Sequence, residues 1–345
     1  MRWISARLQS LVVGLSLLLS VAIYLGGWAA ELPDPVATVT LSPSFFTDAA
    51  FSPDSEYLAV ACTDGTVKLF SKETWELVWE VSLFDGWCAV AFSPDSETIA
   101  ASRRNELDVV FLATRTGREK RRLTLSANIP GHPGREVGGV MFPVFSPDGT
   151  LLACTDGLGT QCVKLVDVET GEELGIPILF DSREGGVQAA FSPDGSQLAS
   201  HGPSGGLAVI DVATQEELLK KSRANCYELA YAPDGSLFIS TETQVEHWDT
   251  TDWTKTLFGT RDAKTKGGVV VQVSPDGSLV ASGLTHLRLW EVESTTLLAS
   301  YDIPVFGYRI GFTWMRFSPD GRFLAATAGF SASIWIWEVS DLVGQ

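Results

Sequence analysis

A short turn sequence, Phe-Ser-Pro-Asp or a close variant, recurs seven times along this 345-residue chain. Successive copies are 41, 53, 46, 40, 42 and 44 residues apart, and they begin at Phe51, Phe92, Phe145, Phe191, Tyr231, Val273 and Phe317. A repeat of roughly 40–45 residues is typical of propellers with four strands in each blade. Proline presets φ at the second turn position, while Ser and Asp side chains bond back to the backbone. The repeat therefore predicts an all-β fold, a seven-bladed β-propeller of four-stranded antiparallel blades.

The residues around each turn indicate how a blade is built. Small residues followed by an aromatic, as in 88–92, predict a crowded innermost strand, and the charged run 216–221 predicts an outer strand protected against edge pairing. Too few residues follow Trp337 for a last outer strand, whereas the strand-like run 36–41 belongs to no repeat. We therefore expect this N-terminal strand to close the last blade, so that residues 36–345 form one propeller domain.

Three further motifs carry a family resemblance over roughly residues 36–339. They are the pairs Trp248-Asp249, Trp290-Glu291 and Trp337-Glu338, the turn Thr63-Asp64-Gly65-Thr66, and the turn Glu169-Thr170-Gly171. In these features the chain resembles the WD-repeat β-propeller family, which implies a non-catalytic protein-interaction scaffold. Most blades lack the Gly-His pair with which a family repeat opens, and Gly131-His132 is the one similar pair. We therefore expect the buried His, Asp and Trp network of the family to be missing from most blades.

The first thirty residues have the pattern of an export signal or an anchor. Arg2 and Arg7 precede an uncharged apolar run, 11–30, and Glu31 and Asp34 follow it. Small residues near Ala29 suit signal-peptide cleavage, whereas the length of the run suits an uncleaved transmembrane helix. Both alternatives predict a propeller exported from the cytoplasm, periplasmic or otherwise extracytoplasmic, after a short linker, 31–35. An uncleaved anchor would place that linker at the face that carries the Ser-Pro-Asp turns.

The net charge bears on the class of partner, and the cysteine count bears on disulfide bonds. The formal net charge of −17 argues against nucleic-acid binding. Residues 103–135 nevertheless hold eight basic and three acidic residues, which indicates either a charged outer strand or a docking site for an acidic partner. Five cysteines, an odd number, favour small buried side chains, with a bridge between Cys154 and Cys162 as the alternative.

Signals for catalysis are weak. His132, His201, His247 and His286 have no metal-ligand spacing, and the chain has no nucleophile elbow, phosphate-binding loop or dinucleotide fingerprint. We therefore predict no enzyme activity and no catalytic, cofactor-binding or metal-binding residues. Two alternatives remain: an envelope enzyme or cofactor protein of the quinoprotein or hydrolase type, and a component of an envelope complex similar to TolB-like propellers, whose repeats also carry Ser-Pro-Asp-Gly.

Aromatic and arginine residues gather in the loops that lead into the innermost strands and in one nearby turn, on the face opposite the Ser-Pro-Asp turns. Such residues are the usual anchors of protein interfaces. The predicted partner-binding residues are Trp87, Arg103, Arg104, Arg135, Tyr227, Phe306, Tyr308 and Arg309. The alternative for each aromatic ring, and equally for Phe46 and Trp314 in the same region, is packing between blades. The leading hypothesis is a monomeric, exported or membrane-anchored scaffold that binds a protein partner through this loop-rich face.

Overall fold

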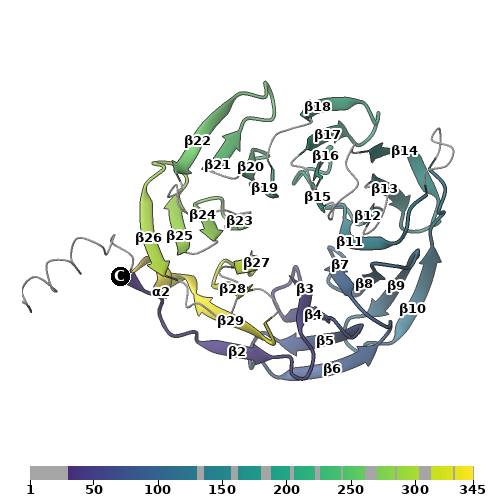
Figure 1. Cartoon of the computed structure of the whole chain (residues 1–345), viewed down its shortest axis with the longest axis horizontal. Helices are drawn as coiled ribbons and strands as arrows, with labels where there is room; N and C mark the ends of the chain where they lie inside the picture. Colours follow the sequence, from purple (N-terminus) through teal and green to yellow (C-terminus); the bar gives the residue numbers. More distant parts are fainter. Residues whose placement is uncertain are drawn as a thin grey trace, which may run out of the picture.

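The protein forms a ring of seven antiparallel sheets around a central axis (Figure 1). The structure, a computed structural model, describes residues 30–129, 136–156, 162–179, 188–202, 206–221, 226–241, 244–260, 270–283, 286–302, 312–328 and 331–344. Within them each sheet is one four-stranded blade, and the sixth sheet carries a short extra strand. The seven-bladed propeller predicted from the turn repeat is confirmed.

The blades follow one another along the chain, and each runs from an innermost to an outermost strand. Blades 1 to 3 consist of β3 (Phe46–Phe51), β4 (Tyr57–Cys62), β5 (Thr66–Ser71) and β6 (Leu77–Ser82); β7 (Cys88–Phe92), β8 (Thr98–Arg103), β9 (Asp108–Ala113) and β10 (Glu119–Thr124); and β11 (Val140–Phe145), β12 (Leu151–Asp156), β13 (Cys162–Asp167) and β14 (Glu173–Leu179). Blades 4 and 5 consist of β15 (Gln188–Phe191), β16 (Gln197–His201), β17 (Leu207–Asp211) and β18 (Glu217–Lys221); and β19 (Glu228–Tyr231), β20 (Leu237–Ser240), β21 (Gln244–Trp248) and β22 (Lys255–Thr260).

The last two blades include the N-terminal strands. Blade 6 consists of β23 (Val270–Val273), β24 (Leu279–Gly283), β25 (His286–Glu291) and β26 (Leu297–Asp302), with β1 (Ala30–Glu31) added outside β26. Blade 7 consists of β27 (Phe312–Phe317), β28 (Phe323–Ala328), β29 (Ser333–Glu338) and β2 (Ala37–Thr40) as its outermost strand. β2 pairs antiparallel with β29, which confirms the predicted closure by the N-terminal strand.

Each recurrent turn is held by the same side-chain bonds. In blade 3 the Ser146 hydroxyl donates to Asp148 Oδ1 at 2.5 Å and accepts the backbone N–H of Leu151 at 2.9 Å. The same pair of bonds forms in every blade except blade 5, where Ala232 stands at the serine position. The blade 5 turn keeps its backbone bonds and the bonds from Ser236 to Asp234. The serine thus links the strands on either side of the turn, which explains why it recurs.

Two blades place serine where the other turns have glycine. Ser55 and Ser96 both adopt a φ of 62°, a left-handed conformation that glycine reaches at lower cost. Their hydroxyls accept backbone N–H groups of neighbouring turns at 3.0 Å: Ser96 from Asp54, and Ser55 from Asp320. These bonds connect the turns of blades 7, 1 and 2 around the ring.

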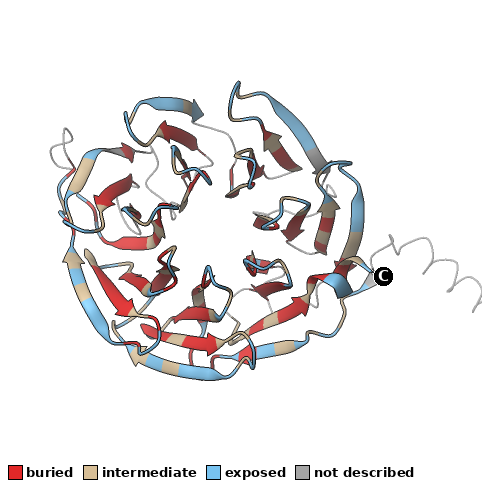
Figure 2. Cartoon of the chain, turned by 180° about the vertical axis from the view of Figure 1, so that it is seen from behind, coloured by how far each residue is buried: buried red, intermediate tan, exposed pale blue. Residues whose placement is uncertain are grey.

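Burial follows the strand order in every blade. The inner strands are buried, whereas the outermost strands are mostly exposed, which Figure 2 shows as a pale rim around a red interior. β10 alternates exposed and half-buried residues, and its Arg122 pairs with Asp108 at 3.1 Å and with Glu119 at 3.2 Å. The basic segment 103–135 thus includes a charged outer strand, which is the first of the two interpretations that its sequence allowed.

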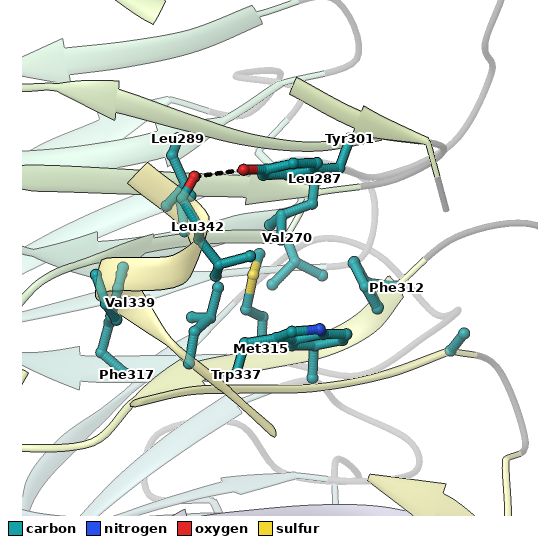
Figure 3. Packing of buried hydrophobic residues seen from close by; sticks show 14 residues of the cluster. Val270, Leu287, Leu289, Tyr301, Phe312, Met315, Phe317, Trp337, Val339 and Leu342 are labelled. Carbon is teal, nitrogen blue, oxygen red and sulfur yellow. Dashed lines mark hydrogen bonds between the residues drawn. The ribbon is translucent and has the colours of Figure 1, made fainter. Parts of the chain in front are cut away.

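The C-terminus is fixed between blades 6 and 7. A single-turn helix, α2 (Val339–Val343), follows β29 and buries Leu342 against both blades (Figure 3). The Tyr301 hydroxyl of β26 donates to the Leu342 carbonyl at 2.6 Å. Closure of the ring therefore involves both ends of the propeller domain.

The expected linker, 31–35, lies along the ring. β1 pairs parallel with β26 at Tyr301 and Asp302, and Trp337 Nε1 donates to the Pro33 carbonyl at 2.8 Å. The turn before β26 is bonded to the Ser-Pro-Asp turn of blade 6, through the Val292 N–H and the Ser278 carbonyl. β26 therefore starts near the Ser-Pro-Asp face, and Asp302, at its other end, lies toward the loop-rich face. The linker reaches the Ser-Pro-Asp face where it enters β2, as expected. Its other end differs from the expectation, because Glu31 pairs with the opposite end of β26.

Residues 1–29, on which the signal or anchor predictions fall, lie outside the described residues. Across the described part of the chain, no helix has the length and apolar character needed to span a bilayer.

All five cysteines are buried. The strand register places Cys154 opposite Lys164, so Cys154 and Cys162 do not face each other across the hairpin. The interpretation of buried apolar side chains is confirmed.

Candidate functional site

The loop-rich face presents an exposed tryptophan beside two arginines on blade 2. Trp87 precedes β7 and is 40% exposed, and the Arg104 guanidinium carbon lies 5.6 Å from its ring centre. The Arg104 backbone N–H also donates to the Trp87 carbonyl at 3.2 Å. Arg103 lies in the same turn and pairs with Glu106 at 2.5 Å. The structure therefore brings together three of the predicted partner-binding residues.

Two glycines make this arrangement possible. Gly86 has a φ of 116°, and a Cβ there would lie 3.9 Å from the Arg103 guanidinium. A Cβ on Gly139 would lie 1.9 Å from the Arg104 carbonyl oxygen, so only glycine lets the segment before β11 pass this close. The same segment is bonded to blade 2 through Val140, whose N–H donates to the Glu106 carbonyl at 2.8 Å. The Trp87 cluster, meaning Trp87, Arg103 and Arg104, thus rests on backbone from two blades.

The other predicted residues are placed differently. Tyr227 precedes β19 on blade 5 and is 40% exposed, so it shares the face but not the Trp87 cluster. Arg135, Phe306, Tyr308 and Arg309 lie outside the described residues. Phe46 and Trp314 are each 5% exposed with ring centres 5.3 Å apart, and their alternative interpretation, packing between blades, is confirmed.

The innermost strands of blades 1 to 5 and 7, with Gln272 of blade 6, surround a cavity of about 900 Å³ on the ring axis. Its lining runs from Trp87 on the loop-rich face to the prolines of several Ser-Pro-Asp turns, such as Pro53 and Pro94. Most lining residues are apolar, because small and aromatic side chains dominate the innermost strands.

Three charged residues in this cavity were missed by the sequence analysis. Arg316 of β27 donates from Nη1 to Glu228 Oε1 of β19 at 3.2 Å, across the innermost strand of blade 6. Asp48 of β3 is 9% exposed, and its Oδ2 accepts the backbone N–H of Val90 at 3.1 Å. Burial raises the pKa of Asp48 to about 7 and also raises the pKa of Glu228, although Arg316 opposes both shifts.

A sequence signal for these residues exists. When the seven repeats are aligned on the turn, Asp48 and Glu228 both lie three residues before the aromatic that ends the innermost strand, and Arg316 lies one residue before it. Other blades have residues such as Ala89 and Ala91 at these positions. Charge in a strand that is otherwise small and apolar is the feature that distinguishes them.

The comparisons with known proteins agree with this geometry. The family model described as "WD domain, G-beta repeat" matches residues 34–71 and 307–338, which include the strands that close the ring. A WD repeat-containing protein of Synechocystis sp. is 30% identical over 183 residues, which cover 49% of this chain and 48% of that protein. The chain is a seven-bladed β-propeller that is similar to WD-repeat proteins in sequence and in fold.

The similarity to the Synechocystis protein is partial, and the similarity to a solved structure concerns the fold. The match to the Synechocystis protein spans about half the length of that relative. The crystal structure of the Swd1 β-propeller domain from Myceliophteria thermophila has a TM-score of 0.67 and covers 88% of this chain and 99% of its own. At 15% sequence identity, this likeness supports the fold alone.

The tryptophans that give WD repeats their name have unusual partners in this propeller. Trp248 Nε1 donates to Glu246 at 3.1 Å, Trp290 Nε1 to the Ser282 hydroxyl at 3.3 Å, and Trp337 Nε1 to the Pro33 carbonyl at 2.8 Å. None of these three bonds involves a histidine or a turn aspartate. In these three blades the indole N–H is therefore bonded to a group outside the family network.

Proposed function

We propose that this propeller is a non-catalytic scaffold, exported from the cytoplasm, that binds a protein partner through its loop-rich face. The observation that carries the proposal is the Trp87 cluster, in which a large ring remains 40% exposed beside an arginine. Tryptophan and arginine contribute most often to interface hot spots, so an exposed pair on rigid strand ends suits a docking anchor. Among the described residues, the His, Cys, Asp and Glu side chains form no group that could hold a metal ion.

The N-terminal segment supports the export part of the proposal. Its basic start and apolar run suit transfer of the following chain across a membrane. Since β1 lies outside blade 6, an uncleaved anchor would join the ring at its edge, near the loop-rich end of β26. Neither face would then be covered by the attachment itself.

The test compares partner capture by matched double variants. The full-length chain is immobilised, and envelope proteins of the producing cell that it retains are quantified by mass spectrometry. Trp87→Ala with Arg104→Ala should reduce retention of the specific partner at least tenfold, because hot-spot truncation costs about 2 kcal/mol or more. Leu218→Ala with Lys220→Ala, on the exposed outer strand β18, is the control and should leave retention unchanged.

Equal retention by both double variants would contradict the proposal, provided that both variants unfold at the temperature of the parent protein. Loss of retention in the β18 control alone would also contradict it, because the interface would then lie on the rim.

A further inference from the structure

The axial cavity has an uneven distribution of charge. Asp48, Glu228 and Arg316 are the only charged side chains among its described lining residues. With both carboxylates ionised, their net charge is −1. The neighbouring polar residues Gln188 and Gln272 are neutral, and the remaining wall consists mainly of alanine, valine, proline and aromatic side chains. A mostly apolar cavity with a few convergent polar groups is the usual form of a small-molecule site.

The single cation among these described lining residues is already engaged. Arg316 bonds Glu228 and the Met315 carbonyl, the latter at 2.9 Å. Asp48 forms no ion pair with any lysine, arginine or histidine of the described chain, although it is more than nine-tenths buried and lines the cavity. Its Oδ2 accepts a hydrogen bond from an uncharged donor, the backbone N–H of Val90. Among the described residues, no positive charge therefore balances that of an ionised Asp48.

We propose that the axial cavity binds a small organic monocation, an alkylammonium or arylammonium compound, with the ammonium group on Asp48 and Glu228. An ammonium group donates charge-assisted hydrogen bonds to carboxylate oxygens, and it cancels the net charge of the three side chains. The apolar body of the ligand lies against the small side chains of the innermost strands, such as Ala49 and Ala190, or against their aromatic neighbours. This inference is independent of the proposed protein interface.

An anionic ligand fits the cavity less well. It would compete with Glu228 for Arg316, and it would add negative charge beside two buried carboxylates. The structure therefore distinguishes ligands of the same shape by the sign of their charge.

Three probes of nearly the same shape test the proposal on the full-length protein: benzylammonium, benzoate and benzyl alcohol. Isothermal titration calorimetry and thermal unfolding should show saturable binding and stabilisation with benzylammonium alone. Affinity should rise between pH 6 and pH 8, because the pKa of Asp48 is about 7 and the ionised form binds the cation. Benzoate binding as tightly as benzylammonium, or no benzylammonium binding at millimolar concentration, would overturn the proposal.

Variants locate the site. Asp48→Asn keeps an oxygen that accepts the Val90 N–H but removes the charge, and it should weaken benzylammonium binding at least tenfold. Asp34→Asn, which removes an exposed carboxylate outside the cavity, is the matched control and should bind as the parent protein does. Equal affinities of the two variants would place the ammonium group elsewhere and contradict the inference.

Discussion

Single serine hydroxyls account for much of the turn geometry. Ser146 is 3% exposed and makes two side-chain bonds in its turn, whereas the equivalent Ala232 makes none. We predict that Ser146→Ala lowers the free energy of unfolding by about 1–2 kcal/mol, since two bonds of a buried turn are lost. Ala232→Ser should raise it by up to about 1 kcal/mol. Denaturation in urea measures both, and two unchanged midpoints would show that the hydroxyl contributes nothing.

Asp48 gives the stability of the ring a pH dependence of its own. Burial raises its pKa to about 7, so the folded chain holds this proton more tightly than the unfolded chain, where an aspartate has a pKa of about 3.9. The contribution of protonated Asp48 to the free energy of unfolding is therefore fully present below about pH 4, and it is lost as the pH rises through 7. We predict that Asp48→Asn has a larger free energy of unfolding than the parent protein. This difference should grow by about 2–4 kcal/mol from pH 5 to pH 8.

Chemical denaturation of both proteins across this pH range measures the difference. The turn aspartates do not disturb the comparison, because they are common to both proteins and bonds such as that from Ser146 lower the pKa of Asp148 instead. A stability difference that is constant from pH 5 to pH 8 would contradict the assignment.

At the scale of elements, ring closure depends on β2. Val39 is 1% exposed in the core between blades 7 and 1, whereas Thr38 on the same strand is exposed. We predict that Val39→Asp lowers the free energy of unfolding by at least about 3 kcal/mol, because it buries an unpaired charge. Thr38→Asp should lower it by less than about 1 kcal/mol. Thermal unfolding and limited proteolysis near residue 37 measure the effect. Similar melting temperatures for the two variants would mean that β2 does not close the ring.

The closing strand could be predicted from the sequence, whereas two short elements, β1 and α2, could not. The run 36–41 was recognised as a closing strand because it alternates like the other strands and the last repeat lacks an outer partner. β1 has only two residues and no pattern, so its pairing with β26 follows from where the chain passes and not from local preference. α2 was missed for a similar reason, since its Leu342 is held by a tertiary bond from Tyr301.

At the scale of the molecule, the turn repeat determined the number of blades but not which side chains meet at the axis. Asp48, Glu228 and Arg316 belong to blades 1, 5 and 7 and are separated in sequence by up to 268 positions, counted from Asp48 to Arg316. Arg316 and Glu228 meet at 3.2 Å, and Asp48 lines the same cavity, only because seven blades close into a ring. The Trp87 cluster was found from sequence because its members flank one blade hairpin.

The most direct test of the central claim is a crosslinking scan that maps the face on which the partner binds. A photoreactive amino acid replaces Trp87 or Tyr227 on the loop-rich face, Ser196 or Ser278 at the Ser-Pro-Asp turns, or Leu218 or Leu257 on the rim. We predict that the partner is crosslinked from positions 87 and 227 and not from the other four. Crosslinks from the turns or the rim, with none from position 87, would contradict the account.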